Sequence, residues 1–73
     1  MNYQDIQDYA DTLCEARIGT ADFNEVMSDI HRAKPTPSEL TAIMTLSDAY
    51  ALSAQGYDVE WDEIENKVQE ILK

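Results

Sequence analysis

The sequence predicts an all-α fold, a small four-helix bundle-like single domain spanning residues 1–73. Three observations support this. Apolar residues recur at steps of three and four, the spacing of one helix face. No stretch alternates apolar and polar residues as a half-buried strand would. Gly19, the Pro35–Pro37 region and Gly56 divide the chain into four segments. A chain this short buries a thin core, so binding to a partner or to a second copy would add stability.

The first helix is predicted over residues 3–18. Asn2 precedes it as a candidate N-cap, and Gly19 follows as a left-handed stop. Its apolar face consists of Tyr3, Ile6, Tyr9, Ala10, Leu13 and Ala16, with Cys14 at the edge.

The second helix is predicted over residues 21–33, with Thr20 as its candidate N-cap. Its cationic residues come last, where they favour the negative end of the helix dipole. Pro35 then prevents continuation. The apolar face consists of Phe23, Val26, Met27 and Ile30.

The third helix is predicted over residues 37–55 and has the clearest start. Thr36 and Glu39 form a capping box around Pro37, a residue favoured at the first helical position. Because apolar residues surround much of this helix, we expect it to be the central one. Gly56 ends it.

The fourth helix is predicted over residues 59–72, with Asp58 as N-cap. Acidic residues fill its first turn, which suits the positive end of the dipole. The apolar stripe consists of Trp61, Ile64, Val68, Ile71 and Leu72.

Net charge is the unusual feature of the composition. Fifteen Asp and Glu against five Lys and Arg give a formal charge of −10. Such a chain repels nucleic acid and anionic membranes, so we expect no direct binding to either, and it attracts basic surfaces. Charges of magnitude about 2–8 suffice to keep a small domain soluble, so solubility alone explains most of this excess but not all of it.

No catalytic or cofactor-binding arrangement is visible, so we expect neither enzyme activity, a cofactor nor a metal. Cys14 and His31 are the only residues of their types, too few for a structural zinc site, and no motif pairs them for catalysis. A calcium loop opening at Asp58 would need Gly and Glu where Glu63 and Gln69 stand. Two glycines cannot build a phosphate-cradling loop. Cys14 is expected to be partly buried and unreactive.

We expect the protein to be cytoplasmic, in the host cell if a phage encodes it. A single cysteine allows no internal disulfide, which fits a reducing compartment. No segment approaches the roughly 18 apolar residues of a membrane span, and the first residues carry acid where a signal peptide carries base.

Two families of short helical proteins invite comparison. The acyl carrier motif, Asp-Ser-Leu at a helix start, is absent, because the segment Leu46-Ser47-Asp48 reverses the order inside a helix. Between Phe23 and Tyr50 the hydrophobic spacing is similar to that of the Hha/YmoA nucleoid modulators, with Asp48 matching an acid in their third helix. The arginines of that family have no counterparts here.

Acidic side chains form stripes along the predicted helices, and they are the leading candidates for partner binding. Carboxylates three or four residues apart share one helix face and rise by roughly 5–6 Å per turn, a spacing that can imitate a phosphate track. In size and charge the chain resembles phage-encoded inhibitors of host defence, including anti-CRISPR proteins that mimic DNA. The expected partner is therefore a protein with a basic, nucleic-acid-binding surface. The candidate acids are Asp5, Asp8, Asp11, Glu15, Asp22, Glu25, Asp29, Glu60, Asp62 and Glu63.

An apolar patch is the alternative. Tyr57 and Trp61, with Tyr3 and Met44, are large apolar residues near segment ends that a thin bundle does not necessarily bury. If exposed, they predict an adaptor, an antitoxin or a regulatory subunit, or a homodimer or larger homo-oligomer built on the same patch. If buried, Tyr57 and Trp61 simply close the core around the third helix.

Overall fold

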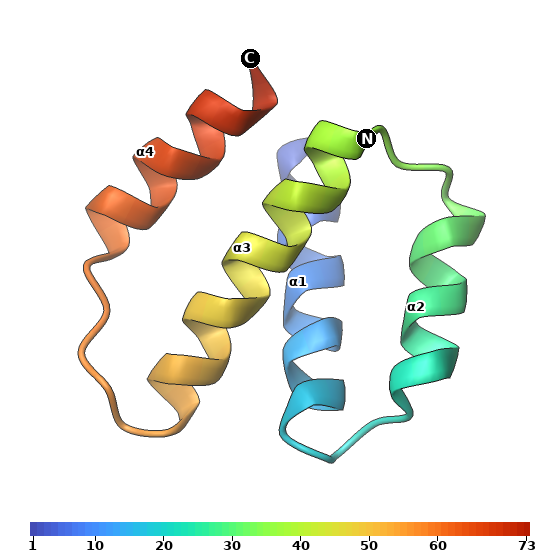
Figure 1. The fold of residues 1–73 in the computed structure, drawn as a ribbon, viewed down its shortest axis with the longest axis horizontal. Helices are drawn as coiled ribbons and strands as arrows, with labels where there is room; N and C mark the ends of the chain where they lie inside the picture. The colour runs from blue at the N-terminus through green and yellow to red at the C-terminus, as the bar shows by residue number, and fades with distance from the viewer.

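The structure, a computed structural model, describes residues 1–73 and contains four helices and no strand (Figure 1). In chain order they are α1 (Tyr3–Arg17), α2 (Phe23–Arg32), α3 (Pro37–Ala54) and α4 (Trp61–Leu72). This confirms the all-α prediction, and each helix lies within a few residues of its predicted range. None of the helices is long and apolar enough to cross a membrane.

The helices form a flat slab. α1 and α3 cross as a central pair, α2 packs against α1, and α4 packs against α3. α2 and α4 lie on opposite sides of this pair and do not contact each other (Figure 1). The slab measures 31 × 31 × 16 Å. It therefore has two broad faces, and we call them the α1 face and the α3 face after the helix whose outward side each one exposes.

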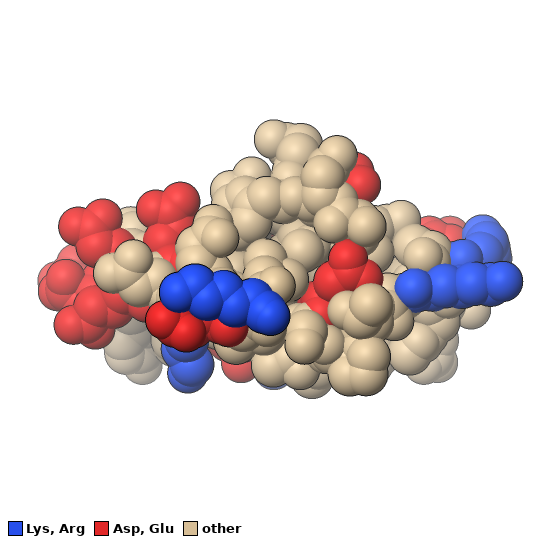
Figure 2. All heavy atoms as spheres, turned by 90° about the horizontal axis from the view of Figure 1, so that it is seen from above, with Lys and Arg blue, Asp and Glu red and all other residues tan.

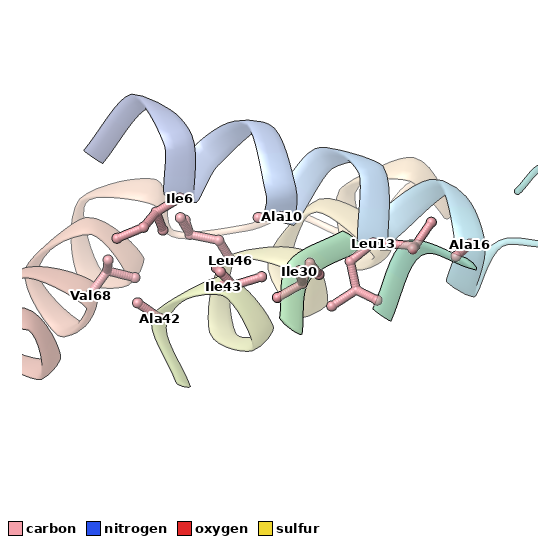
Figure 3. Close-up of a cluster of buried hydrophobic side chains, with 10 residues drawn as sticks. Ile6, Ala10, Leu13, Ala16, Ile30, Ala42, Ile43, Leu46 and Val68 are labelled. Atoms are coloured by element: carbon pink, nitrogen blue, oxygen red, sulfur yellow. The ribbon is translucent and has the colours of Figure 1, made fainter. Parts of the chain in front are cut away.

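The core lies where α1 and α3 cross and is supplemented from both sides (Figure 3). α1 contributes four residues to it and α3 contributes three, so the predicted central helix, α3, shares the central position with α1. α2 adds Val26 and Ile30, whereas α4 adds only one fully buried residue, Val68. The remaining members are Ile6, Ala10, Leu13, Ala16, Ala42, Ile43 and Leu46.

The start of α3 is fixed by the predicted capping box. The Thr36 hydroxyl accepts from the Glu39 N–H at 3.1 Å, and the Glu39 carboxylate accepts from the Thr36 N–H at 2.8 Å. The chain's terminal amine lies 3.2 Å from the same carboxylate and joins the start of α1 to the start of α3. The bond from Thr36 and then the amine hold the pKa of Glu39 below its usual value. At the start of α1, Asn2 accepts from the Asp5 N–H at 2.8 Å, as predicted.

The predicted N-cap of the second helix was wrong. α2 begins at Phe23, and Asp22 caps it by accepting from the Glu25 N–H. Thr20 instead belongs to the end of α1. Its N–H donates to Glu15 O at 2.9 Å and the N–H of Gly19 donates to Ala16 O at 3.2 Å. These two bonds form a Schellman motif, with Gly19 at a φ of 89°.

The predicted start of the fourth helix was also wrong. The end of α3 repeats the Schellman motif, with Gly56 at a φ of 91° and the Tyr57 N–H donating to Leu52 O. The chain then runs without regular structure through Asp58, so this residue caps nothing. α4 begins at Trp61, and its N-cap residue, Glu60, makes no side-chain capping bond.

Candidate functional site

The outward side of α1 carries an exposed row of carboxylates without cationic partners. Asp8, Asp11 and Glu15 occupy successive turns, with Asp5 beside them, and all four are exposed. None forms an ion pair, whereas four other acids in the chain do. Within the row, only Asp8 has a side-chain donor, the Gln4 amide at 3.0 Å. The structure thus confirms that the predicted α1 acids share one helix face, and it leaves their charge unneutralised.

An aromatic pocket lies where α1, α3 and α4 meet. It has a volume of about 230 Å³. Tyr50 of α3 and Trp61 of α4 contribute two of its walls, with ring centroids 5.7 Å apart and planes tilted by 44°. Trp61 is 42% exposed, so it does not simply close the core. The full lining is Tyr3, Gln7, Leu46, Tyr50, Trp61, Ile64 and Glu65.

The carboxylates of the acidic row affect a tyrosine hydroxyl of this pocket. Burial raises the pKa of the Tyr50 hydroxyl most, and the neighbouring Tyr3 together with the carboxylates of Asp11, Asp8 and Glu65 raises it further. The pKa of Tyr3 is also raised, first by burial and then by Glu65. Gln7 of the pocket lining precedes Asp8 by one residue and Asp11 by four, so these two acids lie next to the pocket on α1. We call the acidic row of α1 and the pocket lining together the α1-face site.

The predicted acids on α2 do not belong to this site. Asp22 is engaged as the N-cap, and Asp29 pairs with Arg32 at 3.2 Å. Glu25 is exposed and unpaired. Because α2 lies on the far side of the central pair from α4, its stripe and that of α4 do not converge.

The predicted acids on α4 face away from the pocket or lie at the end of the molecule. Glu60 and Glu63 line a groove of about 360 Å³ between α3 and α4, together with Asp58 and Lys67. Asp62 is exposed beside them, and Tyr57 is 63% exposed in the preceding loop. Figure 2 shows acidic atoms gathered at the end of the slab that α4 occupies, with basic side chains both beside them and at the opposite end.

On the α3 face, an ion pair neutralises an acid of α3. Arg17 of α1 pairs with Asp48 of α3 and also donates to the buried Ser47 hydroxyl at 3.3 Å. Two apolar side chains of α3, Met44 and Leu52, are about half exposed on this face. Arg17 thereby ties α1 to α3 and neutralises the acid at the centre of α3.

Cys14 is buried more fully than predicted, and burial followed by the charges of Asp11 and Glu15 raises its pKa, which disfavours the thiolate. The structure brings together no group of three or more His, Cys, Asp or Glu side chains able to hold a metal ion.

Sequence reasoning missed Gln7, Tyr50 and Glu65 as site residues and treated Tyr3 only as a large apolar residue. Helical spacing contains part of the signal, since Glu65 follows Trp61 by four residues and so shares its side of α4. Tyr50 lies within the third predicted helix. Its place at the pocket depends on how α4 crosses α3, which helical spacing does not specify.

Comparisons with protein-family models, with curated proteins and with solved structures gave no match to this chain.

Proposed function

We propose that this protein is an inhibitor or modulator that occupies a basic, nucleic-acid-binding surface of a larger protein through its α1-face site. The observation that carries the proposal is the unpaired row of Asp8, Asp11 and Glu15 beside an exposed tryptophan. Like charges three or four residues apart destabilise a helix by about 0.2–0.5 kcal/mol per pair. A basic partner would neutralise these carboxylates, which removes their mutual repulsion and adds attraction between them and the cations of the partner.

The geometry of the row suits a surface that normally binds phosphates. Carboxylates on successive helical turns are roughly 5–6 Å apart, and a basic groove built for a nucleic-acid backbone presents Lys and Arg along such a track. A phage-encoded inhibitor of a defence nuclease, as an anti-CRISPR protein is, falls within the same proposal.

Binding through this site should weaken strongly with salt, because exposed charge pairs are screened within about 10 Å at 0.1 M ionic strength. The test is a pull-down with the tagged protein from nuclease-treated bacterial lysate, eluted with a salt gradient and identified by mass spectrometry. We expect a nucleic-acid-binding protein released at moderate salt.

A pair of matched variants then tests the face. Asp8→Asn, Asp11→Asn and Glu15→Gln together neutralise the α1 row, whereas Asp58→Asn, Glu60→Gln and Glu63→Gln remove the same charge from the groove between α3 and α4. Each exposed charge pair contributes about 0.2–1 kcal/mol, so the first triple variant should bind the identified partner about three- to hundredfold more weakly. The second should retain most of the affinity. Equal loss in both variants would mean that net charge, and not this site, drives binding.

The alternative function is an adaptor, antitoxin or regulatory subunit that binds through apolar surface. The half-exposed Met44 and Leu52 on the α3 face favour it, and Tyr57 is exposed in the loop that follows α3. Such a partner would stay bound at high salt and dissociate on Leu52→Ser. A homo-oligomer built on this patch would give the same salt resistance with no foreign protein, and sedimentation analysis of the purified chain would detect it.

A further inference from the structure

The aromatic pocket combines three aromatic rings with a negative rim and no cation. Tyr3, Tyr50 and Trp61 line it from three different helices, and Glu65 is the one charged residue of the lining. No Lys, Arg or His is among its lining residues. Aromatic faces attract cations through the ring quadrupole, and they do so best where the cation is also partly removed from water.

Charge reinforces the rings at this position. The carboxylates of Asp8 and Asp11 on α1 act on the Tyr50 hydroxyl together with that of Glu65, so negative potential from two helices converges on one small cavity. The other large groove beside α4 differs, because Lys67 lines it among its acids. The aromatic pocket is therefore the place on this surface where a cationic side chain gains most.

We propose that the aromatic pocket receives an arginine side chain of the protein partner. A planar guanidinium stacks on tyrosine and tryptophan rings and is less strongly hydrated than an ammonium group. Its N–H groups would donate to the Glu65 carboxylate and the Gln7 amide oxygen at the rim. Arginine is also the residue that nucleic-acid-binding surfaces use for phosphate contacts.

This inference rests on the proposed function, since it names the group that the partner would insert into the α1-face site. Its test needs no partner. The peptide acetyl-Gly-Arg-Gly-amide is titrated into the ¹⁵N-labelled protein, and the indole N–H signal of Trp61, the only tryptophan, is followed. The same peptide with citrulline in place of arginine keeps the shape and removes the charge. Peptides with lysine and with trimethyl-lysine test the other cations.

We expect a saturable shift of the Trp61 signal with the arginine peptide and binding about two- to fivefold weaker or more with the citrulline peptide. Glu65→Gln should weaken arginine binding by a similar factor, whereas Glu70→Gln, which removes the same charge from the same helix, should not. Trp61→Leu should weaken it as well, with the amide signals of Gln7 and Glu65 as the readout and circular dichroism confirming the fold.

Three results would overturn the arginine pocket: no saturable shift, equal binding of the citrulline peptide, or tighter binding of either lysine peptide. These results are separable from the proposed function. If the pocket fails while neutralising Asp8, Asp11 and Glu15 still releases the partner, only this inference is lost. If the peptide binds while those three charges do not matter to the partner, the proposed function is the part that fails.

Discussion

The two outer helices, α2 and α4, are held to the central pair in different ways. α2 buries both Val26 and Ile30, and Asp22 caps its start. α4 buries Val68 alone and lacks a side-chain cap. Yet α4 supplies Trp61 and Glu65 to the α1-face site, while α2 supplies nothing to it.

The comparison shows that the outer helix that adds less to the core, α4, adds more to the candidate site. Regions that bury few apolar residues open locally at low free energy, and binding elements are often drawn from them. Because the pocket exists only while α4 stays against α3, the docking of α4 controls the site. The predictions below test that difference between α2 and α4.

The largest effect should come from Ile30→Ala in α2. Ile30 is fully buried among residues of the central pair (Figure 3). Such truncations cost about 2–5 kcal/mol, against a total of roughly 4–11 kcal/mol for a chain this short. Urea unfolding followed by circular dichroism should show all four helices lost together at a much lower midpoint. Loss confined to α2 would contradict the view that α2 is integral to the core.

Val68→Ala should have a smaller and more local effect. Removing two methyl groups from this fully buried position costs about 1.5–3 kcal/mol with the cavity included. Because Val68 is the one buried residue of α4, we expect fast amide exchange across α4 while α1 and α3 keep their protection. If exchange rises equally in all helices, α4 is not a separately opening unit.

Next in size is the missing cap of α4. Glu60→Asp keeps the charge and provides a side chain of the length that caps helices well, so it should stabilise α4 by roughly 0.5–1 kcal/mol. The reverse exchange on α2, Asp22→Glu, should cost a similar amount, because the longer side chain fits the Glu25 N–H poorly. Urea midpoints measure both changes. No gain from Glu60→Asp would mean that the backbone before Trp61 cannot adopt a capped geometry.

Sequence reasoning recovered what depends on local chemistry. The capping box at Thr36, the stops at Gly19 and Gly56 and the acidic row on α1 all follow from residues within one or two helical turns of one another. The two wrong N-caps have a common physical reason. After a Schellman motif, the residues just past the glycine complete the preceding helix or continue as an irregular link, so a good capping residue there is not available to the next helix.

The site itself required tertiary information. Helical spacing places Asp8 and Asp11 on one face of α1, but it does not specify that Tyr50 and Glu65 reach the same face from other helices. The order of packing, α2 on α1 and α4 on α3, sets which acids converge. It explains why the α2 stripe is excluded although its sequence pattern resembles that of α1.

The smallest effect concerns pH and reports directly on the docking of α4. Burial, the nearby Tyr3 hydroxyl and the surrounding carboxylates raise the pKa of Tyr50 above its usual value of 10.0. Because the folded state holds the Tyr50 proton more tightly than the unfolded state, this protonation contributes to stability. The contribution is complete below the pKa of Tyr50 in the unfolded state and is lost as pH rises through its pKa in the folded state. The protein should therefore weaken above about pH 10, and Tyr50→Phe should reduce the loss.

Tyrosinate absorbance during an alkaline titration follows the ionisation of the tyrosines, and comparison with Tyr50→Phe identifies the contribution of Tyr50. Glu65→Gln removes one of the raising charges and should lower the pKa of Tyr50 slightly. Val68→Ala should lower it more, because an undocked α4 takes away both the burial and the Glu65 charge. Tyr50 would then titrate closer to its usual value while the α2 variant Asp22→Glu leaves it unchanged. If Val68→Ala leaves the titration of Tyr50 as it was, the burial of this hydroxyl does not depend on α4, and the pocket survives without the helix that carries Trp61.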